Sequence, residues 1–352
     1  MNTNDNRKKS HQMIDHIFQD LLPVQGMAKR PEQVTLSHLM LDAMLDGSIA
    51  LCDAGTGIGK TYAYLAAGAA FRHFRATSGQ KFRPILISTS SIALQNAVQT
   101  EYLPTLSAVL MQAGMIDEHL CAVIRKGKSH YVCDHRLERR LDQLDLSKKN
   151  WRAGKALLSL RDQLDIDAAV HLSGYDRDRV CVPKVCDCGR EDCRYRAFLE
   201  DCDNGGFAFH ICNHNLLLAD AIHRGTGRAY ILPDVCAVII DEAHKLPDAA
   251  RQMFGTTLEA GDIHSLIRSL RREKFLLAAE SLAELSAPLL RLMAEPFDTE
   301  KSFQSFSRFL IAPARNLHIV QKQLHGLLTA STNRQLKKLA STIELFTRWC
   351  RQ

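Results

Sequence analysis

The sequence predicts an α/β protein of the doubly wound type, in which a parallel sheet carries helices on both faces. Three short, largely apolar segments predict strands at residues 48–52, 84–88 and 235–240. Segments of helical pattern follow the first two, at residues 60–74 and 93–102. Continuously apolar segments predict strands that are buried on both faces. The expected core is therefore a parallel sheet covered by helices.

Composition excludes several classes of protein. The chain has 352 residues, of which 46% are hydrophobic and 24% are charged, a balance typical of globular proteins. No apolar run reaches the roughly 18 residues of a membrane-spanning helix, and the first ten residues are too polar for a secretory signal. We therefore expect a cytoplasmic protein that makes no membrane contact.

The segments around the predicted strands differ in character from the core. Residues 107–207 hold charged helical runs at 133–146 and 150–164, followed by a cysteine-rich stretch, which predicts an insertion. Residues 256–352 repeat apolar side chains at helical spacing, which predicts three or four antiparallel helices. The predicted organisation is one α/β domain formed by residues 1–106 and 208–255, the insertion, and a C-terminal helical domain.

Charge is concentrated at the C-terminal end of the chain. The net charge is +6, and residues 301–352 hold nine Lys or Arg but one acid, Glu344. Such a basic end is expected to bind a polyanion, or else to form a solvated helical surface. Four of its cations are spaced by seven residues, nearly two helical turns, which predicts two short basic helix faces carrying Lys301, Arg308, Arg315 and Lys322.

A glycine-rich segment follows the first predicted strand and precedes the first predicted helix. Glycines let backbone N–H groups surround a phosphate, and the N-terminus of the helix adds its dipole. Lys60 is expected to contact the β- and γ-phosphates of ATP, and the Thr61 hydroxyl to hold Mg²⁺. The alternative is a turn with an incidental Lys-Thr pair. The segment matches the phosphate-loop pattern G-x-x-x-x-G-K-[ST] except at its first position, and its residues are Ala54, Gly55, Thr56, Gly57, Ile58, Gly59, Lys60 and Thr61.

The third predicted strand ends in the sequence Asp241-Glu242-Ala243-His244. Asp241 is expected to hold Mg²⁺ through water, and Glu242 to orient and deprotonate an attacking water. His244 is expected to sense the γ-phosphate or to couple to bound nucleic acid. A strand that merely ends in surface charges does not explain why this tetrapeptide accompanies a phosphate loop. Together the two motifs predict a nucleoside triphosphatase that acts on nucleic acid.

The D-E-A-H sequence resembles motif II of superfamily 2 helicases, and the chain resembles in particular their iron–sulfur branch, typified by bacterial DinG and by XPD. In that branch an R-x-x-Q element lies near the adenine, and Arg30 and Gln33 match it. The resemblance covers about residues 30–247. It implies an ATP-dependent DNA helicase that moves 5′ to 3′ on single-stranded DNA. Three more segments resemble family motifs: residues 87–95 resemble motif Ia, 126–133 resemble K-G-R-x-N-Y-x-C, and 212–220 resemble N-H-x-L-L-x-D.

Five of the eleven cysteines lie between residues 181 and 202. In a reducing compartment such clustering predicts a metal or a metal cluster rather than disulfides. The resemblance implies a [4Fe-4S] cluster, and its four thiolate ligands match Cys133, Cys181, Cys186 and Cys193. Cys188 is the alternative third ligand. Zinc is the rival metal, although structural zinc sites usually carry C-x₂-C pairs, and loss of the metal is a further alternative.

Motifs that the family needs for turnover are missing from these residues. Neither Q-x-x-G-R-x-x-R, with its arginine finger, nor an S-A-T motif after a strand occurs in the sequence. By resemblance the chain comprises a first motor domain, an iron–sulfur domain and a helical arch, as a fragment or a natural truncation. The second motor domain is expected in the full-length protein.

This organisation predicts ATP and single-stranded DNA binding with little turnover, because losing a transition-state arginine costs about 10³–10⁵ in rate. One alternative is a nucleotide-switched nucleic-acid-binding protein without helicase activity. The other is a CRISPR-associated relative of DinG.

Overall fold

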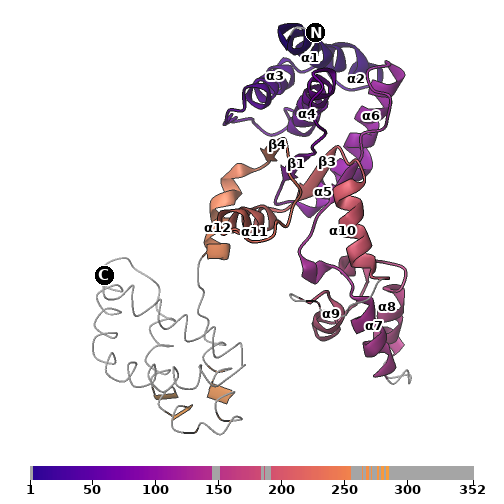
Figure 1. The fold of residues 1–352 in the computed structure, drawn as a ribbon, viewed down its shortest axis with the longest axis vertical. Coiled ribbons are helices and arrows are strands. Elements are labelled where there is room, and N and C mark those ends of the chain that lie inside the picture. The colour runs from indigo at the N-terminus through magenta and orange to yellow at the C-terminus, as the bar shows by residue number, and fades with distance from the viewer. Residues whose placement is uncertain are drawn as a thin grey trace. The chain divides into compact units, whose positions relative to one another are not determined.

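The computed structural model in Figure 1 describes residues 3–144, 151–183, 186 and 192–254, together with scattered residues between 264 and 284. The chain divides into two compact units, residues 1–253 and 254–352. Apart from those scattered residues, the predicted C-terminal helices, including their basic faces at residues 301–322, lie outside the described residues. Within the described part, no helix is long and apolar enough to cross a membrane.

The first unit is built on a four-stranded sheet with the strand order β2-β3-β1-β4, in which every pair is parallel. Parallel neighbours need crossover connections, and helices occupy these crossovers. β1 and β3 are buried along their whole length. The predicted parallel α/β core is thus confirmed. The strands are β1 (Ile85–Ser88), β2 (Ala122–Ile124), β3 (Phe209–Cys212) and β4 (Ala237–Ile240).

The principal core lies between the sheet and α4 (Lys60–Thr77), an alanine-rich helix with a continuous buried face. Gly68 lets this helix approach β3 closely, because a Cβ there would lie 2.8 Å from the Phe209 ring. α1 and α3 pack on the same helix. The other helices are α1 (Thr3–His16), α2 (Leu22–Val24), α3 (Pro31–Asp46), α5 (Ile92–Ala97), α6 (Leu103–Gln112), α7 (Asp134–Asp142), α8 (Trp151–Ser159), α9 (Gly174–Val180), α10 (Arg194–Asn204), α11 (His214–Gly225) and α12 (Leu246–Phe254).

A polar brace joins α1 to α3. The Nδ1 atoms of His11 and His38 lie 2.8 Å apart, and each ring's Nε2 contacts a carboxylate of the opposite helix. His38 contacts Asp15 at 2.9 Å, and His11 contacts Asp42 at 3.1 Å. All three contacts are hydrogen bonds only when one of the two imidazoles carries an extra proton. The brace steadies α3, whose first turn contacts the glycine-rich loop.

The predicted strand at residues 48–52 does not form. Ile49 and Leu51 are 97% and 93% exposed, and no described strand pairs with this segment. β4 is an edge strand, and its Val238 and Ile240 are 48% and 36% exposed, so the predicted burial of that strand on both faces is also wrong. An apolar segment becomes a strand only where it pairs with a neighbouring strand, and residues 48–52 pair with none of the described strands, although the free edge of β4 has unpaired backbone groups.

The region predicted as an insertion has two parts. β2 lies inside residues 107–207 and pairs with β3, so this segment belongs to the sheet. Beyond β2, helices α7, α8 and α9 lie together (Figure 1) around a small apolar cluster of their own. This cluster shares none of its members with the principal core, and its buried residues are Val132, Leu137, Leu157, Leu160, Ile166 and Val180.

Candidate nucleotide site and cysteine-rich insertion

The glycine-rich loop lies between residue 53 and the first residue of α4. Gly57 and Gly59 adopt φ values of 86° and 89°, in the left-handed region that favours glycine. Gly59 is the N-cap of α4, so Lys60 is the first helical residue and Thr61 the second. The loop therefore leads directly into the N-terminus of an 18-residue helix, where unpaired N–H groups and the helix dipole favour an anion.

Two segments far apart in the sequence meet beside this loop. Lys60 Nζ lies 3.1 Å from Glu242 Oε1, and both side chains are about one-third exposed. This ion pair holds the pKa of the Glu242 carboxyl below its ordinary value. Glu242 itself has a φ of 52°, which is unusual for a residue with a side chain and is typical of functional sites. His244 is mostly exposed, and its Nδ1 lies 3.4 Å from Glu242 Oε2.

Asp241 is buried between the ends of β4 and β1. Its backbone N–H donates to the Ser88 carbonyl at 2.8 Å, which continues the pairing of the two strands. Burial, followed by the neighbouring charge of Glu242, raises the pKa of the Asp241 carboxyl, while Lys60 opposes this rise. Mg²⁺ prefers oxygen donors, such as this carboxylate and the Thr61 hydroxyl, and Lys60 lies close enough to Asp241 to act on its charge. Asp241 and Thr61 therefore fit the predicted metal pair in type, with Thr61 contributing a hydroxyl.

Arg30 and Gln33 contact the backbone of the loop, a role that the sequence did not predict. Arg30 donates to the Gly57 carbonyl and Gln33 donates to the Gly59 carbonyl, both at 2.7 Å. A Cβ at Gly59 would lie 2.3 Å from Gln33 Nε2. Glycine at position 59 is thus required twice, by its backbone conformation and by the Gln33 amide. The expected proximity of both residues to the adenine stays a prediction.

The segment 212–220 organises the same edge of the sheet. His214 is buried and its Nδ1 lies 2.7 Å from the Ser88 hydroxyl, at the end of β1. Burial lowers the pKa of His214, so this imidazole is held neutral. Asp220 accepts hydrogen bonds from the backbone N–H groups of Ile231 and Leu232, at 2.7 and 2.9 Å. These bonds shape the approach to β4, and sequence analysis marked the segment without identifying this role.

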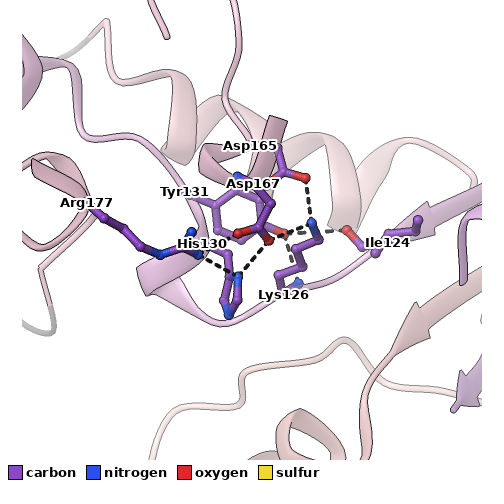
Figure 2. Close-up of polar contacts among 7 residues, drawn as sticks. All are labelled: Ile124, Lys126, His130, Tyr131, Asp165, Asp167 and Arg177. Atoms are coloured by element: carbon purple, nitrogen blue, oxygen red, sulfur yellow. Dashed lines mark hydrogen bonds and ion pairs between the residues drawn. The ribbon is translucent and has the colours of Figure 1, made fainter. Parts of the chain in front are cut away.

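The segment after β2 anchors the insertion through a polar network (Figure 2). Lys126 Nζ lies 2.6 Å from Asp165 and 3.0 Å from Asp167. His130 and Arg177 also contact Asp167, at 2.8 and 2.5 Å. Burial acts to raise the pKa of Asp167, but hydrogen bonds from Arg177, His130 and Lys126 outweigh it and hold that pKa well below its usual range.

Tyr131 ties this network to the sheet, as Figure 2 also shows. Its hydroxyl accepts a hydrogen bond from the Lys126 N–H at 2.9 Å and donates to the Ile124 carbonyl, on β2, at 3.4 Å. Its ring packs against Tyr195 and Phe198 of α10. The segment that resembles K-G-R-x-N-Y-x-C therefore connects the sheet to the insertion, and it ends at Cys133.

Backbone contacts bring three of the predicted thiolate ligands into one region. Val132 pairs with Cys181 across an antiparallel bridge, and the Cys133 N–H donates to the Val180 carbonyl at 2.8 Å. Cys193 is the N-cap of α10, and the next residue, Arg194, pairs with Asp134, which directly follows Cys133. The chain thus folds so that the neighbours of Cys133, Cys181 and Cys193 contact one another.

The surroundings of the fourth predicted ligand, Cys186, are described only in part. Cys186 is exposed, whereas its flanking residues 184–185 and 187–191, and with them Cys188, lie outside the described residues. Within the described part of the chain, no group of three or more His, Cys, Asp or Glu is positioned to hold a metal ion. The donor type still fits a thiolate-bound group, because Cys133, Cys181 and Cys193 come from three segments that converge.

Other cysteines have a structural character. Cys202 and Cys212 are buried, which is the commonest position of a free cysteine, and Cys236 is partly buried. Burial raises the pKa of Cys202 to about 11 and that of Cys212 to about 12. Thiols that stay protonated are poor metal ligands and poor nucleophiles. These three residues therefore do not compete with the converging cysteines for the role of ligand.

No protein-family model matches the chain, but several curated proteins are similar to it. ATP-dependent DNA helicase YoaA of Escherichia coli K12 is 30% identical over 261 residues, which cover 70% of this chain and 38% of that protein. The 3'-5' exonuclease DinG of Bacillus subtilis is 25% identical over 82% of this chain and 31% of its own length. ATP-dependent DNA helicase DinG of Photobacterium profundum is 29% identical over 56% of this chain and 29% of its own length.

This chain therefore spans between 29% and 38% of the length of these three relatives. The matches with YoaA and with the Bacillus DinG cover more than two thirds of this chain. Relatives named YoaA and DinG, at 30% and 25% identity over 70% and 82% of this chain, support a DinG-like helicase family for it.

Proposed function

We propose that the chain is the nucleotide-binding part of an ATP-dependent DNA helicase, with residues 1–106 and 208–255 forming its first motor domain. The observation that carries the proposal is the 3.1 Å contact between Lys60 and Glu242, residues from the two motifs that nucleoside triphosphatases of this type combine. The helicase names of the relatives support the DNA-dependent part of the proposal.

The ion pair suggests how nucleotide binding frees Glu242 to act as a general base. While Lys60 holds Glu242, the carboxylate has a lowered pKa and is a weak base. Phosphate oxygens of ATP compete for the Lys60 ammonium, and the freed Glu242 then orients a water and accepts its proton. Mg²⁺, held by Asp241 and Thr61, supplies charge neutralisation on the phosphates. His244, which is exposed beside Glu242, transmits the state of the γ-phosphate to bound nucleic acid.

We also propose that residues 107–207 carry a [4Fe-4S] cluster on Cys133, Cys181, Cys186 and Cys193, with Cys188 as the alternative to Cys186 and zinc as the rival metal. The convergence of three cysteine-bearing segments supports this proposal. Anaerobically purified protein is then brown, with an absorbance shoulder near about 400 nm. Cys133→Ser, Cys181→Ser and Cys193→Ser each remove the colour, whereas Cys202→Ser does not. A colourless protein with one equivalent of zinc contradicts the iron–sulfur proposal.

The remaining elements follow from family resemblance. Residues 256–352 form a helical arch-like domain, the full-length protein adds a second motor domain, and the assembled helicase moves 5′ to 3′ on single-stranded DNA. The chain alone binds ATP and single strands with little turnover, because it lacks a transition-state arginine in a recognisable motif. A nucleotide-switched DNA-binding protein without helicase activity is the second candidate, favoured by the same missing motif.

Calorimetry with ATP and Mg²⁺ tests the nucleotide site. Lys60→Ala abolishes ATP binding, whereas Lys8→Ala, an exposed lysine on α1, leaves it unchanged. Equal ATP affinity in the two variants contradicts the phosphate-site assignment. Steady-state ATP hydrolysis with and without single-stranded DNA, measured on this chain and on any longer product of the gene, separates the two candidate functions. A DNA-stimulated rate in the longer product supports the helicase.

A further inference from the structure

A cationic hollow lies at the turn between α4 and β1, and its four charged lining residues are Arg72, Arg75, Lys81 and Arg83. Its volume is about 90 Å³, and Gln80, Ala76 and the Phe82 ring complete its wall. A second hollow of about 220 Å³ adjoins it and shares the segment 81–83. The wall of the second hollow includes Asp203 and Asp234, whereas the wall of the cationic hollow contains no acid.

The cations of the cationic hollow are not paired with acids in the part of the chain that the structure describes. Within the described residues, none of its four cations forms an ion pair with an acid, although Arg140, Arg194 and Arg224 each pair with an aspartate. Burial lowers the pKa of Arg72, which shows that its guanidinium has lost water without gaining a carboxylate. A partly desolvated, unpaired guanidinium is costly, and an anion from outside the chain would offset that cost.

The hollow also offers an aromatic surface. The Arg72 guanidinium lies 4.6 Å from the centre of the Phe82 ring, and the Phe82 side chain is 49% exposed. Lys81 and Arg83 on either side of it are exposed as well. Arg75 donates to the Lys81 carbonyl at 2.9 Å, which fixes the turn that presents these three residues. Cations that alternate with an exposed aromatic ring are typical of surfaces that bind single-stranded nucleic acid.

The position of the hollow separates it from the candidate nucleotide site. Arg83 precedes the first residue of β1, whereas the glycine-rich loop and Glu242 lie at the carboxyl ends of the strands. Four strand residues place these two edges more than about 13 Å apart. A cation in the last turn of α4 also interacts favourably with the helix dipole, which accounts for Arg75. That explanation does not extend to Lys81 and Arg83, which follow the end of the helix.

We propose that the cationic hollow binds the backbone phosphates of single-stranded nucleic acid, on the edge of the sheet opposite the candidate nucleotide site. The proposal rests on the proposed DNA-dependent function and extends it to a second contact surface. Phosphates pair with Lys81 and Arg83 and complete the charge balance of Arg72, while a base stacks on Phe82. An acidic peptide is the less favoured ligand, because the hollow offers one aromatic side chain and no apolar groove to hold a peptide.

The test measures binding of a fluorescent oligothymidine to the whole chain by anisotropy over a series of salt concentrations. Lys81→Gln with Arg83→Gln removes two phosphate contacts, and we expect the slope of log affinity against log salt to flatten by up to about 1.4. Lys8→Gln with Arg228→Gln removes one exposed lysine and one exposed arginine elsewhere and leaves the slope unchanged. Equal slopes in the two double variants overturn the proposal.

A second variant tests the aromatic contact. Phe82→Leu keeps an apolar side chain beside Arg72, and we expect it to weaken binding by about tenfold without a change in salt slope. Unchanged affinity in Phe82→Leu removes the stacking part of the proposal. Binding of ATP by Lys81→Gln with Arg83→Gln stays at the wild-type level, because these residues lie at the opposite edge. Absence of oligothymidine binding in the wild-type chain overturns the DNA-dependent function itself, whereas binding with an unaltered slope in the variant overturns this inference alone.

Discussion

The two edges of the sheet differ in whether their cations have partners within the protein. At the carboxyl edge, Lys60 is neutralised by Glu242 at 3.1 Å, and Arg30 is occupied by the Gly57 carbonyl. At the amino edge, the four cations of the cationic hollow have no acidic partner among the described residues. A ligand at the first edge must displace an internal partner, whereas a ligand at the second edge meets a field that is already unbalanced. The carboxyl edge is therefore suited to a ligand that displaces Glu242 from Lys60. The amino edge is suited to a ligand that is attracted by unpaired positive charge.

The largest expected effect comes from distorting the carboxyl edge. Gly59→Ala forces a left-handed conformation on alanine and places a Cβ 2.3 Å from Gln33 Nε2, so the loop must move. We expect ATP affinity to fall by at least about 100-fold, because loop N–H groups no longer converge on a phosphate. Gly55→Ala is the matched control, since its Cβ would meet only Ile58 at 3.7 Å and its φ is not positive. Calorimetry on both variants decides, and equal losses would contradict this account of Gly59.

The amino edge predicts a pH effect on stability. His210 of β3 is 1% exposed, and burial together with the charge of Arg125 lowers its pKa to about 4 from 6.5. Between these values the unfolded chain binds a proton that the folded chain rejects, so stability is complete above about pH 6.5 and falls as the pH drops toward 4. The loss is about 3 kcal/mol. Urea unfolding at several pH values measures it, and His210→Asn removes this part of the slope while carboxylates elsewhere affect both proteins alike.

The sequence predicted the parts of the fold that local pattern determines. Residues 84–88 and 235–240 contain β1 and β4, and residues 60–74 lie inside α4, because apolar runs and a glycine-rich start mark them. β2 and β3 were not predicted, since β2 has three residues and His210 interrupts the apolar run of β3. The failure at residues 48–52 has another cause. A strand also needs a partner strand, which no local pattern reveals.

In the candidate site, too, local motifs predicted some residues, whereas contacts that depend on the tertiary fold were not predicted. Lys60 and Glu242 belong to motifs, so sequence analysis named both residues, and the structure brings them together. The contacts of Arg30 and Gln33 with loop carbonyls depend on where α3 begins relative to the loop, which is tertiary information. The cationic hollow escaped sequence analysis for a similar reason. Its four cations are ordinary in the sequence and become distinctive because none of them forms an ion pair with an acid among the described residues.

A smaller effect tests the packing that supports both edges. Gly68→Ala places a Cβ 2.8 Å from the Phe209 ring in the principal core, and we expect the free energy of unfolding to fall by about 1–3 kcal/mol. Gly225→Ala at the end of α11 meets nothing within 4 Å and is expected to be neutral or slightly stabilising. Phe209→Leu added to Gly68→Ala restores part of the loss by making room. Additive losses in the double variant would show that the two residues do not compete for space.

The smallest expected change in ATP affinity tests whether Glu242 competes with phosphate for Lys60. Glu242→Gln removes the charge that holds Lys60 but keeps the shape of the side chain, so ATP no longer competes with an internal carboxylate. We expect ATP to bind about two- to fivefold more tightly, since a partly exposed ion pair contributes up to about 1 kcal/mol. Turnover in any longer product of the gene falls by about 10²–10⁴, because the base is lost. High salt should reduce the gain in ATP affinity, because salt already screens the ion pair in the parent protein. The loss of turnover should depend less on salt. Weaker ATP binding in Glu242→Gln, measured by calorimetry at low salt, would contradict the competition between Glu242 and phosphate for Lys60.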